Sequence, residues 1–258
     1  MAETPFLGRV AVVTGAGTGL GAAIARELAA AGADLLLHYR SHASSLDTVA
    51  ADCRATGRRV ETGQADFAAD PGSAARLVDL AAERLGRVDI LVNNAANTTK
   101  LEPVLEMRRE LFEETLAVNV TAPFLAAQAA ARHMVAQGWG GRIVNIGSVH
   151  GRQSAPAHTA YETSKGAIDA LTFSLAVALG GSGITVNCVA PGAIVVERYD
   201  GSGWDEDWFI SRTPVGRNGR PEDIAAMVRF LCTDEAGFVT GETIYVDGGM
   251  TRRMPLVK

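Results

Sequence analysis

The sequence has few cysteines, few aromatic residues and no long apolar run, and each shortage excludes a class of protein. Cys53, Cys188 and Cys232 are the three cysteines among 258 residues, and they stand too far apart for a metal site or a disulfide framework. No apolar run approaches the roughly 20 residues that a membrane-spanning helix needs. Residues 1–6 lack the basic start and apolar stretch of a secretory signal. These absences predict reduced core thiols, no metal and a cytoplasmic protein.

Positive charge is also scarce. The chain has 24 Lys and Arg against 29 Asp and Glu, a net charge of −5 and a pI near 5.6. This balance argues against binding to nucleic acid or to an anionic membrane. Apolar residues make up 47% of the sequence, as in globular proteins. No linker rich in Pro or Ser and no internal repeat divides the chain, so we expect a single domain over residues 1–258.

Short apolar runs alternate with helical patterns along the chain. Several runs, such as residues 90–92, are apolar at every position, which is typical of strands covered on both faces. The alternation predicts right-handed crossovers and an α/β fold with a doubly wound parallel sheet of about seven strands. Ligands of such sheets bind at the carboxyl ends of the strands. The expected strands are 10–13, 34–38, 58–63, 88–92, 142–147, 183–189 and 242–246, and the expected helices are 19–31, 43–55, 70–84, 103–137 in two pieces, 160–179 and 221–231.

A glycine-rich turn separates the first expected strand from the first helix. The run Thr14-Gly15-Ala16-Gly17-Thr18-Gly19-Leu20-Gly21 follows the strand, and an alanine-rich helical pattern continues from it. Strand, glycine turn and helix in this order predict a dinucleotide site. Glycines let backbone N–H groups approach a pyrophosphate, and the helix N-terminus favours that anion. The alternative is a turn of the same kind without a ligand.

A tyrosine and a lysine stand one helical turn apart, at Tyr161 and Lys165, with Ser148 upstream of them. Residues at i and i+4 share one face of a helix. A cation held beside a phenol favours the phenolate, which would suit Tyr161 to act as a general acid or base. Taken alone, the pair is equally consistent with a surface tyrosine beside a solvated lysine.

Together these motifs resemble those of the classical short-chain dehydrogenase/reductase family over nearly the full length of the chain. The family's Thr-Gly-x-x-x-Gly-x-Gly falls on residues 14–21, its Asn-Asn-Ala-Gly on 93–96 with Ala96 in place of the last glycine, and its Pro-Gly on 191–192. The resemblance implies a single-domain Rossmann-like fold, a nicotinamide dinucleotide, and interconversion of a ketone or aldehyde with an alcohol by hydride transfer.

The resemblance also implies roles for individual residues. Tyr161 is expected to exchange a proton with the substrate oxygen, Ser148 to hydrogen-bond that oxygen, and Lys165 to support the phenolate and bind the nicotinamide ribose. Asn119 is expected to hold a water that links Lys165 to solvent. The expected catalytic residues are Asn119, Ser148, Tyr161 and Lys165. The expected cofactor contacts are Gly15, Thr18, Gly19, Leu20, Gly21, Arg40, Ser41, Asp66, Phe67, Asn93, Ala95, Tyr161, Lys165, Pro191, Gly192 and Ile194.

The end of the second strand bears on the choice of cofactor. It has no carboxylate where one would grip a ribose 2′-hydroxyl; Tyr39 stands there, and Arg40 and Ser41 follow. An arginine and a hydroxyl at this point suit a 2′-phosphate, so the sequence favours NADP(H), with NAD(H) as the alternative. Thr18, where NADP-preferring relatives often have a basic residue, weakens this preference. Asp66 resembles the family's adenine-contacting aspartate, and it is also a candidate N-cap of the next helix.

The substrate is the least defined part of the prediction. Residues 193–213 follow the Pro-Gly turn, mix carboxylates with aromatic side chains, and are expected to close over the substrate as the corresponding family segment does. His150, Arg152, Gln153 and His158 lie between Ser148 and Tyr161 and could add polar contacts. The polar lining favours a small polyhydroxylated or polar carbonyl compound. The reductase types expected from the resemblance are therefore those of a small polar carbonyl or of a 3-oxoacyl substrate.

The sequence also allows two alternative functions. One is an NAD-linked sugar or polyol dehydrogenase, and the other is a non-catalytic dinucleotide-sensing protein. The expected helices at 103–137 and 160–179 are apolar enough to pair across a two-fold axis. The resemblance therefore implies a homotetramer or homodimer that acts on a small carbonyl or alcohol substrate.

Overall fold

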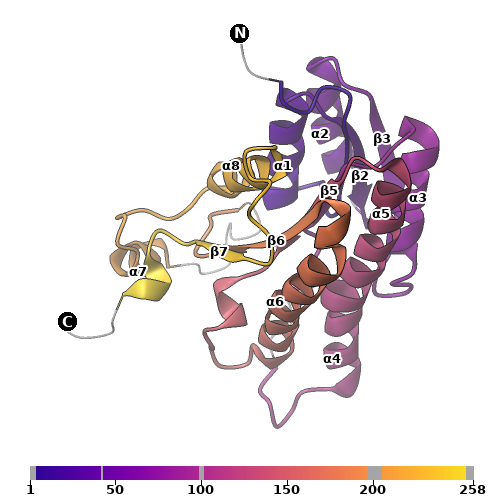
Figure 1. Ribbon diagram of the computed structural model, residues 1–258. Coiled ribbons are helices and arrows are strands. Elements are labelled where there is room, and N and C mark those ends of the chain that lie inside the picture. Colours follow the sequence, from indigo (N-terminus) through magenta and orange to yellow (C-terminus); the bar gives the residue numbers. More distant parts are fainter. Residues whose placement is uncertain (1–3, 42, 99–101, 197–204, 254–258) are drawn as a thin grey trace.

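The computed structural model describes residues 4–41, 43–98, 102–196 and 205–253, and it forms one seven-stranded parallel sheet (Figure 1). The expected α/β, doubly wound architecture is confirmed. The strand order is β3-β2-β1-β4-β5-β6-β7, so the order reverses between β1 and β4. The strands are β1 (Val10–Val13), β2 (Asp34–Tyr39), β3 (Val60–Gln64), β4 (Ile90–Asn93), β5 (Gly141–Ile146), β6 (Ile184–Pro191) and β7 (Thr243–Val246).

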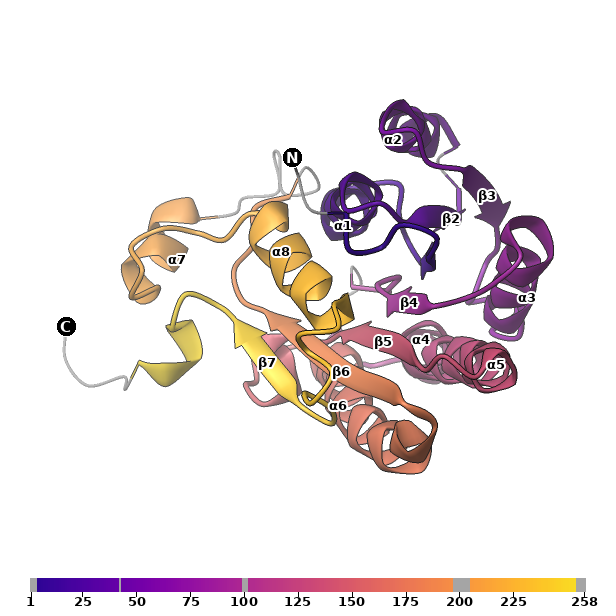
Figure 2. The same cartoon turned by 45° about the horizontal axis from the view of Figure 1, so that its top comes forward.

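Helices cover both faces of this sheet (Figures 1 and 2). One face packs against α1 (Gly19–Ala30), α2 (Ala43–Ala55) and α8 (Pro221–Cys232). The other packs against α3 (Ser73–Leu85), α5 (Ala122–Gln137) and α6 (Thr159–Leu179). Two separate hydrophobic clusters result, one on each side.

Strand β1 is apolar at every position because both of its faces are covered. Ala11 and Val13 belong to the cluster beneath α1, whereas Val10 and Val12 belong to the opposite cluster. Successive side chains of a strand point to opposite faces, and here neither face meets solvent. The four side chains are therefore buried, as the pattern predicted.

The long helical pattern at 103–137 starts later than expected and is interrupted once. Helix α4 begins only at Arg109 and runs to Leu116, and a π-helical turn, η1 (Ala117–Thr121), joins it to α5. Pro123 lies at the start of α5 and has no N–H to donate to the carbonyl of Asn119, four residues earlier. The break therefore falls at Asn119, a residue expected at the active site.

Two further features were not predicted: the start of α3 and a short helix after β6. Helix α3 begins at Ser73, and Asp66 instead accepts the N–H of Ala68 in a preceding turn, so Asp66 does not cap this helix. The expected substrate-covering segment contains a short helix, α7 (Glu206–Arg212), which stands apart from the sheet near the C-terminal turn (Figure 2). Residues 197–204 of that segment lie outside the described residues.

The three cysteines are free and buried, as expected. Burial raises the pKa of the Cys53 thiol to about 11 and those of Cys188 and Cys232 to about 12. Across the described part of the chain, no group of acidic, His and Cys side chains could hold a metal ion. None of its helices is both long and apolar enough to cross a bilayer.

Candidate active site

One cavity at the carboxyl edge of the sheet brings together most of the predicted residues. Its volume of about 800 Å³ is in the range of ligand and cofactor sites. It lies where the strand order reverses between β1 and β4, the usual binding position in such sheets. The predicted residues that line it are Gly15, Thr18, Gly19, Leu20, Gly21, Arg40, Ser41, Asp66, Phe67, Ala95, Ser148, Tyr161, Lys165, Pro191, Gly192 and Ile194.

The glycine turn forms one wall and has the features of a phosphate site. Gly15 and Gly19 have positive φ angles of 65° and 52°, and a Cβ at Gly21 would collide with the carbonyl oxygen of Gly15. Thr18 precedes α1 without a side-chain capping bond, and the first turn of α1 has no acidic residue. The N-terminal N–H groups of α1 are thus free of side-chain acceptors and suit an anion. These residues fit the pyrophosphate of a dinucleotide.

Hydrogen bonds fix this turn to the end of β4. The hydroxyl oxygen of Thr14 accepts the N–H groups of Asn94 (2.9 Å) and Ala95 (3.0 Å). In return, the amide of Asn94 donates to the carbonyls of Thr14 (2.8 Å) and Gly15 (3.0 Å). The turn after β1 and the loop after β4 are therefore held together where the strand order reverses.

The opposite wall carries the predicted catalytic residues. Lys165 is buried, and its Nζ donates to the carbonyl of Ile146 at the end of β5 (2.7 Å). The same nitrogen lies 5.5 Å from the ring centre of Tyr161. The Ser148 oxygen accepts the N–H of His150 (3.1 Å), which leaves its own hydrogen available to a ligand. The i, i+4 spacing and the strand end thus place all three side chains on one side of the cavity.

Asn119 is a buried brace behind this wall. Its amide oxygen accepts the N–H of Asn97 (2.7 Å), and its amide nitrogen donates to the carbonyl of Asn97 (3.1 Å) and to Ser164 (3.0 Å). Ser164 in turn donates to the carbonyl of Tyr161 (2.6 Å). The Asn119 side chain thus holds the loop after β4 and helix α6 together, and it is not among the residues that line the cavity. A π turn at such a residue is common at functional sites.

Asn93 also lies behind the cavity wall. Its amide donates to the side chain of Asn145 (2.9 Å) and to the carbonyl of Pro123 (3.3 Å), and it is absent from the lining. Asn145 donates onward to Thr172 on α6 (3.0 Å). The side chain of Asn93 therefore braces β4 against β5, and the expected contact between this residue and the cofactor stays a prediction.

Arg40 and Ser41 stand at the outer end of the cavity, after β2. Both are exposed, and the carbonyl of Arg40 accepts an amide hydrogen of Gln64 (3.0 Å). The guanidinium of Arg40 forms no ion pair with any residue in the described ranges. It is thus available to an anionic group of a ligand.

His38, Asn97 and Ser164 are part of the site and were missed by sequence reasoning. His38 lines the cavity, and its ring stacks on Phe67 with 4.3 Å between ring centres. Burial lowers the pKa of His38 to about 4. A polar residue within an apolar strand was the signal that could have identified it. Ser164 stands between the two motif residues of its helix, and nothing in its sequence context distinguishes it from a surface serine.

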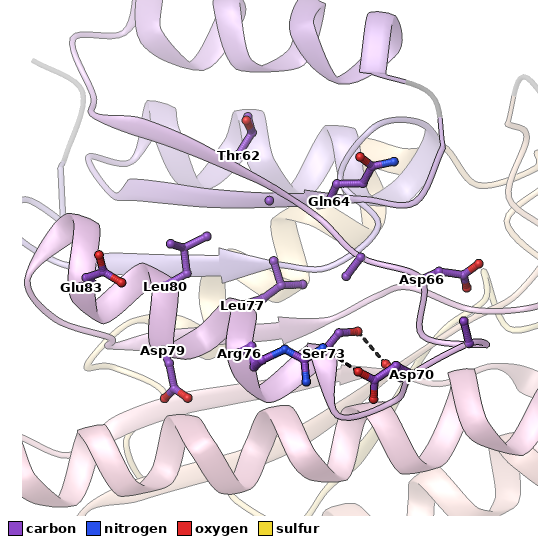
Figure 3. A pocket seen from close by; sticks show the side chains of 13 residues that line it. Thr62, Gln64, Asp66, Asp70, Ser73, Arg76, Leu77, Asp79, Leu80 and Glu83 are labelled. Atoms are coloured by element: carbon purple, nitrogen blue, oxygen red, sulfur yellow. Dashed lines mark hydrogen bonds and ion pairs between the residues drawn. The ribbon is translucent and has the colours of Figure 1, made fainter.

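A second hollow, of about 680 Å³, lies between β3 and α3 at the sheet edge (Figure 3). Asp70, Arg76 and Asp79 line it, and Asp70 pairs with Arg76 (2.5 Å). It contains none of the predicted catalytic residues and shares only Ala65 and Asp66 with the main cavity. The main cavity is therefore the candidate active site.

Comparison with known proteins agrees with this geometry. A family model described as enoyl-(acyl carrier protein) reductase matches residues 15–251. Glucose 1-dehydrogenase 2 of Bacillus subtilis is 36% identical over 247 residues, which cover 95% of each protein. The chain belongs to the short-chain dehydrogenase/reductase family. It is accordingly an NAD(P)-dependent oxidoreductase.

Solved members of the family superpose closely on the chain. Acetoin dehydrogenase from Enterobacter cloacae is 36% identical with a TM-score of 0.90, and the match covers 98% of this chain and 99% of that one. A blue fluorescent protein from a metagenomic library, solved in complex with NADPH, is 40% identical with a TM-score of 0.88 and covers 95% and 99%. The similar proteins thus share the fold while their named substrates differ.

The buried His38 predicts a loss of stability in mild acid. Its pKa of about 4 in the folded chain lies below the ordinary value of 6.5, so the unfolded chain binds the proton first as the pH falls. The stabilisation is complete above pH 6.5 and is lost as the pH falls toward 4. Between pH 7 and pH 5 the free energy of unfolding should fall by about 2 kcal/mol more in the wild type than in His38→Asn. Urea unfolding at both pH values measures this, and equal losses in the two proteins would contradict it.

Proposed function

We propose that the protein is an NADP(H)-dependent reductase of a small polar ketone or aldehyde. The observation that carries this proposal is the cavity itself, in which Ser148, Tyr161 and Lys165 face a glycine turn that fits a pyrophosphate. The bound nicotinamide would supply the hydride, and the residues supply position and proton transfer.

The side chains divide the work at the substrate oxygen. The hydroxyl of Ser148 donates a hydrogen bond to the carbonyl oxygen, which orients it and stabilises the negative charge that develops there. The phenol of Tyr161 donates the proton that completes the alcohol. Lys165, held by the carbonyl of Ile146, places a positive charge beside the phenol and stabilises the phenolate that remains. In the reverse direction the same groups accept the proton.

The preference for NADP(H) depends on Arg40. Its guanidinium lies at the outer end of the cavity and is unpaired within the described residues, and a 2′-phosphate there would form charge-assisted hydrogen bonds with it and with Ser41. The absence of a carboxylate at Tyr39 removes the usual partner of a free 2′-hydroxyl. The NADPH complex of a similar protein is consistent with this choice.

The substrate side of the cavity is polar. The rings of His150 and His158 stack with 5.1 Å between their centres, and His150 meets the ring of Tyr161 edge-on at 5.9 Å. Ala157 holds a strained positive φ of 65°, directly before His158. Strain of this kind persists where the surrounding structure requires it, often at functional sites. An imidazole pair beside the acid suits a substrate with a second oxygen next to the carbonyl.

A second candidate function has specific support. An NAD-linked sugar or polyol dehydrogenase would also use the imidazole pair, and a glucose dehydrogenase is among the similar proteins. A sensor without catalysis is less favoured, because the serine, tyrosine and lysine all line the cavity.

We also propose a cytoplasmic homotetramer or homodimer. Exposed apolar side chains gather on two neighbouring helices, Phe124 and Val135 on α5 with Phe173 and Val177 on α6. Such a surface would be covered by a second copy of the chain.

Replacing Arg40 with Ala should separate the two cofactors. We expect the KM for NADPH to rise about 10–100-fold, because charge-assisted hydrogen bonds to the 2′-phosphate are lost. The KM for NADH should stay within twofold. Arg84→Ala, an exposed arginine on α3, serves as the control. Initial rates with both cofactors test this. Equal rises in the two KM values would contradict a contact between Arg40 and the 2′-phosphate.

Replacing Tyr161 with Phe should abolish most turnover without loss of cofactor binding. We expect kcat to fall about 10²–10⁴-fold, since phenylalanine has no hydroxyl to donate the proton. NADPH affinity, measured by fluorescence, should change little. Tyr245→Phe removes a buried hydroxyl outside the cavity and should keep wild-type turnover. Near wild-type turnover of Tyr161→Phe would contradict the assignment of Tyr161 as the general acid and base.

A substrate panel tests the proposed chemistry directly. Small hydroxyketones and diketones with NADPH should give higher kcat/KM values than sugars with NAD⁺ or 3-oxoacyl thioesters. Initial rates across the panel with both cofactors would show it. Highest activity with a sugar and NAD⁺ would establish the second candidate instead, and no activity with any compound would favour the sensor.

A further inference from the structure

His38 is a buried imidazole that joins three segments of the cofactor cavity. It stands at the end of β2 and is 2% exposed. Its Nδ1 accepts the N–H of Gly15 in the glycine turn (3.0 Å), and its Nε2 lies 3.1 Å from the carbonyl oxygen of Ala65, after β3. Its backbone carbonyl accepts the N–H of Ala16 (2.8 Å). His38 thus fixes the position of the turn after β1 relative to the turn after β3.

The partners determine the state of the ring. The Gly15 N–H can only donate and the Ala65 carbonyl can only accept, so the imidazole is neutral with its hydrogen on Nε2. Both ring nitrogens are therefore used inside the protein. His38 has no free polar atom for a substrate, and its effect on a ligand must pass through the residues that it holds.

Those residues belong to the adenosine half of the cavity. Gly15 lies in the turn that fits the pyrophosphate, and Phe67, on which the ring stacks at an interplanar angle of 17°, lies beside Asp66 in the segment after β3. Loss of the ring would leave the partly buried N–H of Gly15 without its acceptor and would free the two segments to move apart. The serine lies in the loop after β5, the tyrosine and lysine lie on α6, and His38 contacts none of them.

We propose that His38 is a positioning residue that sets the affinity for the adenosine half of the cofactor. It does so by holding the glycine turn against the wall formed by Phe67, and it takes no part in hydride or proton transfer. The ligand class that it governs is an adenine nucleotide, with or without a 2′-phosphate. The effect is therefore common to NADPH and NADH, unlike that of Arg40.

Two substitutions separate the hydrogen bonds from the ring. His38→Phe keeps a ring for the stack on Phe67 and loses both bonds, whereas His38→Asn keeps an acceptor close to the position of Nδ1. We expect His38→Phe to raise the KM for both cofactors about tenfold or more, with kcat at saturating cofactor within twofold. His38→Asn should recover most of the affinity. His133→Asn, a partly exposed histidine on α5, is the control.

Half-molecules of the cofactor sharpen the test. AMP, as a competitive inhibitor against NADPH, should bind His38→Phe correspondingly more weakly, whereas nicotinamide mononucleotide should bind the wild type and the variant alike. If His38→Phe does not fold, His38→Gln, which keeps only a donor toward Ala65, takes its place. The proposal is overturned by an unchanged KM, by a fall in kcat as large as the rise in KM, or by His38→Asn behaving like His38→Phe. Because the readout is binding of the adenine half, loss of the proposed substrate preference would leave it unaffected.

Discussion

The hydrogen bond from Lys165 to the carbonyl of Ile146 ties together the two elements that carry the chemistry. Ile146 ends β5, two residues before Ser148, and Lys165 lies one helical turn after Tyr161. A buried ammonium is costly unless it is paired. It has three hydrogens, and the carbonyl accepts one, so the amine can serve a ligand without losing its anchor. The bond thus fixes the strand end against the helix that carries Tyr161.

Around this bond, polar side chains brace the loops at the carboxyl edge. Thr14 and Asn94 join β1 to β4, Asn93 and Asn145 join β4 to β5, and Asn119 joins the β4 loop to α6. Each of these groups is buried or half-buried, where an unsatisfied amide would be costly and a satisfied network rigidifies its surroundings. Loops that would otherwise be mobile therefore present fixed walls to a ligand.

The sequence predicted the architecture and most of the cavity lining because both depend on local patterns. Apolar runs mark strands covered on two faces, and glycines mark the turn. The division of the 103–137 pattern into two pieces was predicted, whereas the π form of the turn at Asn119 was not, because the helical pattern continues through it. The hydrogen bonds of the Asn93 side chain to Asn145 and Pro123 were not predicted, because these partners come from β5 and from the start of α5. His38 was missed because its partners come from two other strand ends that only the folded sheet brings together.

The reversal of strand order has a consequence for how such a protein can change. The turns that follow β1, β2 and β3 hold the residues expected to recognise the adenosine half of the nucleotide, while the loop after β5 and helix α6 hold the proposed reacting groups. Pro191, Gly192 and Ile194, which are also expected to contact the cofactor, line the crevice on the side of the reacting groups. Mutations at one border of the crevice can therefore change which of the two nucleotides binds. Mutations at the other border can change the substrate without altering that choice.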